Sequence, residues 1–190
     1  MLVVHIIIGL NVGGAELMLR RLCESLTTQE DKHVVVSLTK IGKVGELLQS
    51  KGIEVVALNL SSVFTAPIVF FRLMKLVKLY KPDIVQTWMY HADFIGGLAA
   101  YCVGVKNIIW GVRTTDVEAG GNKRTAFIRS VCARLSFFIP RFVVCAADAS
   151  RRAHIEAGYD ARKMVVIANG FDLSVLSATE EERMFVRSAN

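Results

Sequence analysis

Residues 2–16 read LVVHIIIGLNVGGAE, and this stretch decides how the chain begins to fold. Residues 2–8 are almost entirely apolar and rich in β-branched side chains, with His5 as their one ionisable group, which is typical of a strand buried on both faces of a sheet. A turn containing Gly13 and Gly14 follows, and from Ala15 apolar residues recur at helical spacing. Because a helix start carries unpaired N–H groups and the positive end of a dipole, this loop is a candidate anion site. The alternative is a tight strand-to-helix turn without a ligand.

Working outward, the same alternation of apolar strand and amphipathic helix continues along the chain. The expected further strands cover residues 33–38, 53–58, 83–88, 107–112, 141–146 and 164–168. The expected further helices cover residues 45–52, 66–81, 91–103, 123–138 and 149–157. Strands that alternate with helices predict βαβ units, hence a Rossmann-like α/β fold with a parallel sheet and helices on both faces. In such folds ligands bind beyond the carboxyl ends of the strands.

Composition restricts the class of protein. The chain has 190 residues, 53% of them apolar, so it can bury a substantial core. A net charge of +6 favours anionic partners, among which nucleic acid, phosphorylated substrates and acidic lipids all qualify. The four cysteines are widely spaced inside apolar segments, so we expect reduced core residues of a cytosolic protein. We expect no signal peptide, because the apolar start has no basic region before it and leads straight into a helical pattern. We expect no membrane span, because no stretch approaches about 20 apolar residues.

Two junctions after predicted strands carry groups suited to chemistry. His91 and Asp93 follow the strand at 83–88, and Arg113 and Thr114 follow the strand at 107–112. For His91 and Asp93 the alternatives are a helix N-cap and a first-turn acid stabilised by the helix dipole. Arginine can bind phosphate oxygens through its planar fork, and the alternative for Arg113 is a surface ion pair with Asp116. Together with Gly13 and Gly14, these junctions predict a binding site at one sheet edge.

A dinucleotide-binding domain fits the sequence poorly. The spacing of Gly9, Gly13 and Gly14 departs from the GxGxxG fingerprint, and the second strand ends without the acid that would hold an adenosine ribose. A nucleotide-cofactor oxidoreductase is therefore the weaker rival.

The helix at residues 66–81 combines four basic side chains with many large apolar ones. Such a helix could lie on an anionic membrane surface. The alternative is ordinary core packing on one side and a solvated basic face on the other.

Five segments resemble the N-terminal domain of a GT-B glycosyltransferase of the family 4 type, a family of retaining nucleotide-sugar transferases. They are NVGGAE (11–16), VQTWMYHADFIGGLAA (85–100), IIWGVRTTD (108–116), FVVCAADASRRAHIEAG (142–158) and VVIANGFD (165–172). The resemblance implies two Rossmann-like halves that face each other across a cleft. Residues 1–172 would be the acceptor-side half, and residues 173–190 a linker toward a donor-binding half that these 190 residues lack. The fragment alone would then be inactive.

The resemblance also implies roles for single residues. His91, Arg113 and Thr114 would lie at the reacting centre. The donor diphosphate sugar or the acceptor would be approached by a second group, namely Gly13, Gly14, Glu16, Asn169 and Gly170. The chain departs from the family pattern at Arg113, where many relatives have histidine, and at Ala147, where serine is usual.

The expected function is therefore transfer of a sugar from a nucleoside diphosphate sugar to a glycan or lipid-linked acceptor. We expect no tightly bound cofactor, no metal, since no Asp-x-Asp cluster is present, and no nucleic-acid partner. The expected location is the cytoplasm, with peripheral contact to the membrane through residues 66–81. The rival from another class is a stand-alone domain that binds an anionic glycan or a protein partner without chemistry.

Overall fold

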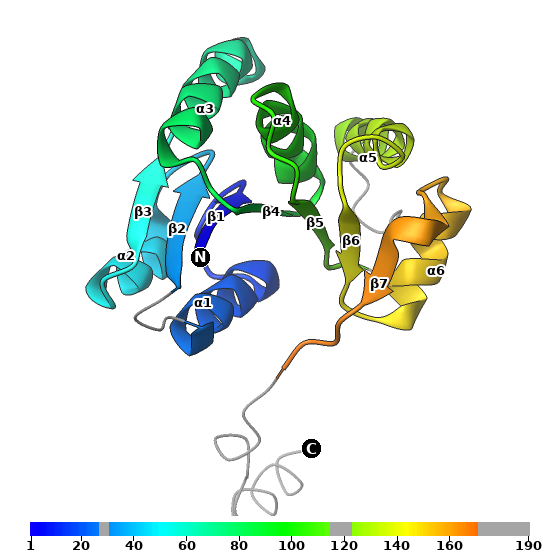
Figure 1. The fold of residues 1–190 in the computed structure, drawn as a ribbon, viewed down its shortest axis with the longest axis horizontal. Coiled ribbons are helices and arrows are strands. Elements are labelled where there is room, and N and C mark those ends of the chain that lie inside the picture. The colour runs from blue at the N-terminus through cyan, green and yellow to red at the C-terminus, as the bar shows by residue number, and fades with distance from the viewer. Residues whose placement is uncertain (27–30, 115–122, 171–190) are drawn as a thin grey trace, which may run out of the picture.

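One parallel sheet organises the molecule (Figure 1). The structure, a computed structural model, describes residues 1–26, 31–114 and 123–170. Within these ranges seven strands pair in the order β3-β2-β1-β4-β5-β6-β7, and every neighbouring pair is parallel. The expected Rossmann-like α/β fold is confirmed.

The element bounds agree with the sequence-based ones to within a few residues. The strands are β1 (Leu2–Ile7), β2 (Lys32–Ser37), β3 (Glu54–Ala57), β4 (Ile84–Trp88), β5 (Ile108–Val112), β6 (Phe142–Cys145) and β7 (Met164–Val166). The helices are α1 (Gly14–Leu26), α2 (Gly42–Ser50), α3 (Ala66–Tyr80), α4 (Tyr90–Cys102), α5 (Lys123–Leu135) and α6 (Asp148–Glu156). Short 3-10 turns are η1 (Val63–Thr65) and η2 (Ala161–Lys163).

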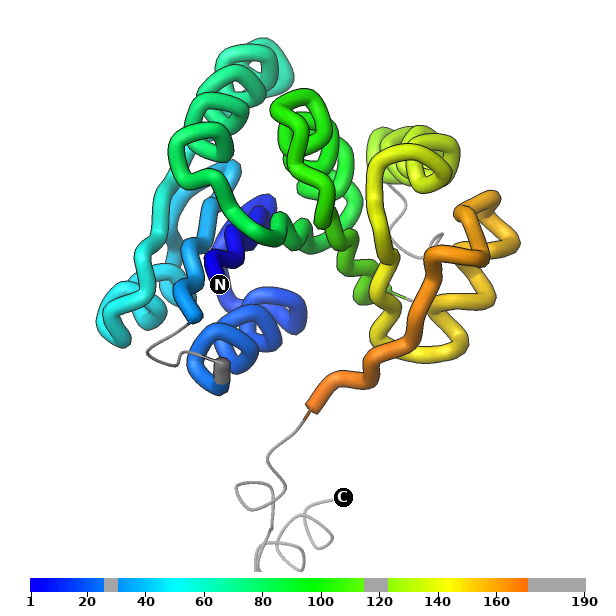
Figure 2. The backbone as a smooth tube through the Cα atoms, in the orientation of Figure 1, coloured from blue at the N-terminus to red at the C-terminus, as the bar shows by residue number. Residues whose placement is uncertain are grey.

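Helices cover both faces of the sheet, because the direction in which successive strands are added to the sheet reverses once. From β1 the chain moves outward to β3, which places α1 and α2 on one face; it then crosses to β4 and moves the other way, which places α3, α4 and α5 on the opposite face (Figure 1). The tube in Figure 2 shows the segment after β7 leaving the sheet on the side where α1 lies.

Alternate residues of the central strand serve the two faces. Val4 and Ile6 belong to the larger core, beneath α3, α4 and α5. Ile7 belongs to the smaller core beneath α1 and α2, with Leu19 and Leu48. Both faces are covered, and this explains why β1 is an unbroken apolar run with no polar alternation.

Two sequence-based boundaries need correction. The N-cap of α4 is Met89, at φ 71°, so His91 is the second helical residue and the N-cap interpretation of His91 is wrong. The helix expected to begin at residue 45 begins at Gly42, which has a positive φ of 65° and lies so close to Leu10 that a Cβ would meet the Leu10 carbonyl at 2.6 Å. The expected linker at 173–190 lies outside the described residues.

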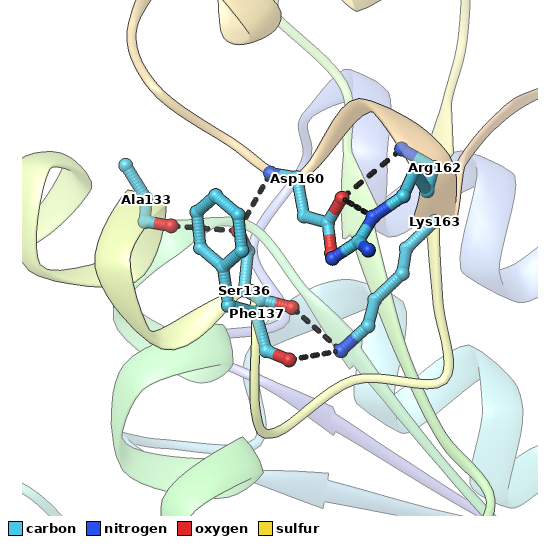
Figure 3. Close-up of polar contacts among 6 residues, drawn as sticks. All are labelled: Ala133, Ser136, Phe137, Asp160, Arg162 and Lys163. Atoms are coloured by element: carbon cyan, nitrogen blue, oxygen red, sulfur yellow. Dashed lines mark hydrogen bonds and ion pairs between the residues drawn. The ribbon is translucent and has the colours of Figure 1, made fainter.

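The C-terminal end of α5 is held by a polar cluster that is structural (Figure 3). Ser136 Oγ donates to the Ala133 carbonyl and accepts from the Asp160 backbone N–H at 2.9 Å. Lys163 Nζ donates to the carbonyls of Ser136 and Phe137 at 2.9 and 2.7 Å. A cation on the free carbonyls of a helix end is the electrostatically favoured arrangement. This cluster fixes α5 against the approach to β7.

The cysteines are only partly as expected. Cys23, Cys132 and Cys145 are buried, whereas Cys102 is exposed at the end of α4. None of the four is in a disulfide. The expectation that all four are core residues is wrong for Cys102.

Helix α3 has one buried apolar side and one exposed basic side, which agrees with either interpretation given above, membrane contact or a solvated basic face. Val69, Leu73 and Val77 are buried against the sheet, while the basic residues lie on the exposed side. Within the described ranges, no helix has the length and hydrophobicity needed to cross a bilayer.

Candidate functional site

A cavity of about 670 Å³ opens at the carboxyl edge of the sheet. It lies between one face of α1 and the segment that follows β7, with Trp88 and Arg113 contributed by the ends of β4 and β5. Its lining residues are Met18, Arg21, Leu22, Glu24, Ser25, Trp88, Arg113, Ile167, Ala168 and Gly170. The carboxyl ends of parallel strands all open onto this edge, which is where α/β folds bind ligands.

Arg113 is the centre of the cavity's polar chemistry. Its guanidinium carbon lies 4.7 Å from the centroid of the Trp88 ring, a cation–π arrangement, and Nη1 donates to Asn169 Oδ1 at 2.6 Å. Nε has no hydrogen-bond partner among the described residues. Burial lowers the pKa of Arg113, but an arginine keeps its charge at neutral pH. The site therefore holds a fixed cation that retains hydrogen-bonding capacity.

Trp88 is held in place by two buried histidines. Its indole Nε1 donates to His5 Nδ1 at 3.4 Å, so the His5 proton lies on Nε2, which donates to His33 Nδ1 at 3.0 Å. Burial, and to a smaller extent His33, lowers the pKa of His5 to about 3, which keeps its ring neutral. This chain fixes the indole plane on which Arg113 lies.

His5, His33 and Cys23 are close enough to suggest a metal site, since their ligand atoms lie within 4.8 Å of one another. The two imidazole planes are only 10° apart, and the ring centroids are 5.3 Å apart across a 3.0 Å nitrogen–nitrogen distance. With these distances the two facing nitrogens lie on the line between the ring centroids and point at each other, as a hydrogen bond requires. Two nitrogens that bound one metal ion would both point at the ion instead. Burial also raises the pKa of the Cys23 thiol to about 12, which opposes formation of a thiolate ligand. These three residues fit a hydrogen-bonded core better than a metal.

The glycine loop lies apart from the cavity lining. Gly14 is the first residue of α1, and the Gly13 carbonyl accepts the first helical hydrogen bond, from Leu17 N at 3.0 Å. The Glu16 carboxylate folds back over Gly13, where a Cβ would collide with it. Glu16 thus packs on its own helix start, where a negative charge is stabilised by the dipole. Gly14 has open space around it.

His91 and Asp93 are separated by the geometry of α4. His91 is half-buried, and burial lowers the pKa of its imidazole. Asp93 is fully buried, and its Oδ1 accepts from Thr87 Oγ1 at 2.5 Å. Burial raises the pKa of Asp93 well above its ordinary value, and this outweighs the opposing effects of the Thr87 hydroxyl and the Gly111 backbone. Asp93 lies in the first turn of α4, as the alternative interpretation has it, but its carboxyl group is fully buried and does not line the cavity.

Thr114 is fixed through its backbone. Its carbonyl accepts from Ser150 Oγ at 2.7 Å, and the Ser150 carbonyl accepts from His154 Nδ1 at 2.7 Å. His154 Nε2 then accepts from the Tyr90 hydroxyl at 2.6 Å. This buried chain ties the end of β5 to α6 and to the first turn of α4. Asp116, the expected ion-pair partner of Arg113, lies outside the described residues.

The structure thus brings Arg113 and Gly170 to one cavity, with Asn169 hydrogen-bonded to Arg113 and Thr114 next to Arg113 along the chain. Gly13, Gly14, Glu16 and His91 do not line it. The sequence analysis did not predict that Arg113 lies over the Trp88 ring. Trp88 could have been selected as His91 was, because it stands at the carboxyl end of a predicted strand. The sequence analysis also missed Arg21 and Ser25, which belong to a face of α1 with helical spacing, residues 18, 21, 22 and 25.

Comparison with known proteins places this geometry in context. The chain is 29% identical to the capsular polysaccharide biosynthesis glycosyltransferase CapH of Staphylococcus aureus over 191 residues, which is 97% of this chain and 52% of CapH. Its fold is similar to that of Anabaena HepE in complex with UDP-glucose, with a TM-score of 0.78 and 19% identity over 100% of this chain and 49% of HepE. The UDP-N-acetylglucosamine 2-epimerase of Rickettsia bellii is also similar, with a TM-score of 0.63 and 15% identity over 89% of this chain and 45% of the epimerase. The chain therefore spans about half the length of these proteins.

At such low identity the structural likenesses show the fold alone, which transferases and epimerases share. The family is decided by a different finding, because the model of Glycosyltransferase Family 4 matches residues 12–175, most of the chain. The described fold is the N-terminal, Rossmann-like half of a GT-B protein, and the chain belongs to Glycosyltransferase Family 4.

Proposed function

We propose that this chain is the acceptor-side half of a retaining glycosyltransferase that moves a sugar from a nucleoside diphosphate sugar to a glycan or lipid-linked acceptor. The observation that carries the proposal is Arg113, a half-buried cation that lines the cavity, lies over Trp88 and is hydrogen-bonded to Asn169. Membership of Family 4 supports the reaction type, and HepE, of similar fold, has been crystallised with UDP-glucose.

Arg113 supplies the chemistry that such a transfer needs on this side of the cleft. A departing nucleoside diphosphate develops negative charge, and a preorganised cation with hydrogen-bond donors stabilises that charge in the transition state. The guanidinium is already partly desolvated and is oriented by Trp88 and Asn169, so little reorganisation is required when the donor binds. Asn169 orients Arg113 through its side-chain amide oxygen, and Gly170 leaves the adjacent wall of the cavity free of a side chain.

The other expected site residues take supporting roles in this proposal. The N–H groups of Gly13 and Gly14 face the donor or acceptor from the start of α1, with Glu16 beside them. His91 and Thr114 approach the transferred sugar, and Thr114 is positioned by its backbone bond to Ser150. The nucleotide sugar is a substrate, not a resident cofactor.

The remaining parts of the proposal concern the whole enzyme. A second half would bind most of the donor, so the 190 residues alone should bind nucleotide weakly and turn nothing over. The reaction would take place in the cytoplasm, as a step of polysaccharide biosynthesis. Residues 66–81 would face the membrane.

The test is nucleotide-sugar turnover by a protein that joins this chain to a Family 4 donor-binding half. Arg113→Ala should lower kcat by about 10² to 10³, the cost of removing one charge-stabilising donor. Arg113→Lys should restore only part of this, because the bidentate fork and the stacking on Trp88 are lost. The matched control is Arg141→Ala, at the other edge of the sheet, which should leave kcat unchanged. A folded fusion that turns over no donor would favour the rival, a binding domain without chemistry.

A further inference from the structure

Three buried side chains connect the two junctions at which the sequence analysis placed the reacting centre, namely Ser150, His154 and Tyr90. The first two belong to α6, and Tyr90 is the first residue of α4 (Figure 1). Their hydrogen bonds begin at the carbonyl of Thr114, the residue directly after Arg113. They end at Tyr90, the residue directly before His91.

The direction of every hydrogen bond in this chain is fixed. A carbonyl can only accept, so His154 Nδ1 carries the proton that it donates to the Ser150 carbonyl at 2.7 Å. His154 Nε2 is then an acceptor, and the Tyr90 hydroxyl donates to it at 2.6 Å. Burial, with a smaller contribution from Arg129, lowers the pKa of His154 and outweighs the opposing effect of the Ser150 carbonyl, which favours this neutral ring.

The Thr114 carbonyl stands where β5 has just ended. The ladder of β5 continues to Val112, which pairs with Cys145 on β6. Beyond that pair the Ser150 hydroxyl, in the first turn of α6, donates to the Thr114 carbonyl at 2.7 Å. Arg113 therefore lies between two anchored backbone positions, one in the sheet and one on α6.

The contacts of the Arg113 side chain tolerate little movement of its backbone. The guanidinium carbon lies 4.7 Å from the centroid of the Trp88 ring, and Nη1 lies 2.6 Å from Asn169 Oδ1. A displacement of about 1 Å would take that hydrogen bond beyond its useful length. The arginine side chain is also long and has many rotamers, so its end contacts alone define its position poorly.

We propose that Ser150, braced by His154 and Tyr90, is a positioning residue that holds the backbone at Arg113 so that the guanidinium lies over Trp88. Because the same chain ends on Tyr90, it also sets the spacing between the turn that carries Arg113 and the turn that carries His91. The consequence for sugar transfer rests on the proposed function. The positioning itself does not.

The first measurement is the fluorescence of Trp88 in the 190-residue chain with Trp110→Phe, which leaves one tryptophan. Arg113→Ala removes the cation from the indole and gives the full change in emission. Ser150→Ala should move the emission toward that of Arg113→Ala, and Tyr90→Phe should do so by a smaller amount. In the Arg113→Ala background, Ser150→Ala should add nothing. If Trp110→Phe unfolds the chain, the same differences are read against the emission of Trp110.

The second measurement is kcat and KM of the protein that joins this chain to a Family 4 donor-binding half. Ser150→Ala should lower kcat about tenfold, the cost of one buried hydrogen bond. KM should change little, because the charge that Arg113 stabilises develops only in the transition state. In the Arg113→Ala background, Ser150→Ala should lower kcat by less than about twofold, because no side chain is left to position.

Two matched controls remove comparable hydroxyl groups outside the chain. Ser136 is fully buried, and its hydroxyl also donates to a backbone carbonyl, within α5. Ser136→Ala should lower Tm about as much as Ser150→Ala, yet leave the tryptophan emission and kcat unchanged. Tyr159 packs edge-on against His154, with ring centroids 5.1 Å apart, but its hydroxyl has no hydrogen-bond partner among the described residues. Tyr159→Phe should therefore leave the emission and kcat unchanged as well.

The outcomes separate this inference from the proposed function. The inference is overturned if Ser150→Ala leaves the Trp88 emission unchanged, or if it lowers kcat equally with and without Arg113, because Ser150 would then act on the fold in general. If Arg113→Ala leaves kcat unchanged while Ser150→Ala still shifts the emission, the positioning stands and the proposed function fails. Circular dichroism of each variant confirms that it is folded before it is compared.

Discussion

Each face of the sheet buries an ionisable group, a base on one face and an acid on the other. Beneath α1 lies His5, whose pKa burial lowers to about 3, and beneath α4 lies Asp93, whose pKa burial raises. Both groups are held neutral at moderately acidic pH, because a low-dielectric interior penalises a charge of either sign. On the α1 face the neutral group supports the cavity through Trp88, whereas on the α4 face it only joins α4 to Thr87 on β4. The His5 network therefore supports the cavity, whereas the Asp93–Thr87 hydrogen bond supports only the packing of the core.

The largest expected effect concerns the pH dependence set by His5. Between pH 3 and 6.5 the unfolded chain binds a proton on this residue that the folded chain does not, so stability rises with pH across this window. Integrated over the shift, the contribution is about 4 to 5 kcal/mol. His5→Gln cannot titrate and should reduce the difference in unfolding free energy between pH 4 and pH 7, measured by urea denaturation. Equal differences in the variant and the wild type would show that His5 is charged in the folded protein.

Asp93 should act with the opposite sign. Its raised pKa means that its contribution to stability is present below pH 3.8 and is lost as the pH rises toward the folded-state value. Asp93→Asn mimics the protonated acid, so it should raise stability at pH 7 relative to the wild type and leave it little changed near pH 4. The measurement is Tm by calorimetry at both values. A variant that is destabilised equally at both would mean that the Thr87 bond, not the charge, dominates.

A smaller effect is expected from the difference in packing between α4 and the start of α1. A Cβ at Gly97 would collide with the Trp110 indole on the α4 face, whereas a Cβ at Gly14, the first residue of α1, has open space. Gly97→Ala should therefore cost about 1 to 3 kcal/mol. Gly14→Ala should be neutral to within about 0.5 kcal/mol or slightly stabilising. Urea unfolding of the two variants checks this pair, and equal effects would contradict the close packing of α4 on β5.

The sequence alone was enough to predict the helices, the strands and the fold class, and particular residues show why. Leu2–Ile7 form a strand because β-branched side chains dominate them, and α3 ends at Tyr80, with Lys81 as its C-cap, because Pro82 cannot continue the helix. The carboxyl-edge rule pointed to Arg113, which the structure does place in the cavity. Strand order and the Trp88–His5–His33 chain depend on contacts between residues up to 83 positions apart, and no local pattern encodes them. The burial of Asp93 was missed for the same reason, because its partner Thr87 lies on the strand that α4 covers.

We propose that the cavity over Trp88 contacts the nucleotide sugar when a donor-binding half holds it, and the two tryptophans of the chain test this directly. Trp88 lines the cavity and Trp110 is buried on the opposite face. In the protein joined to a donor-binding half, adding UDP-glucose should quench tryptophan fluorescence in a Trp110→Phe variant, with matched tryptophan removals in the donor-binding half. The same addition should leave a Trp88→Phe variant without a response. Quenching that survives in Trp88→Phe and disappears in Trp110→Phe would place the ligand on the other face and contradict the account.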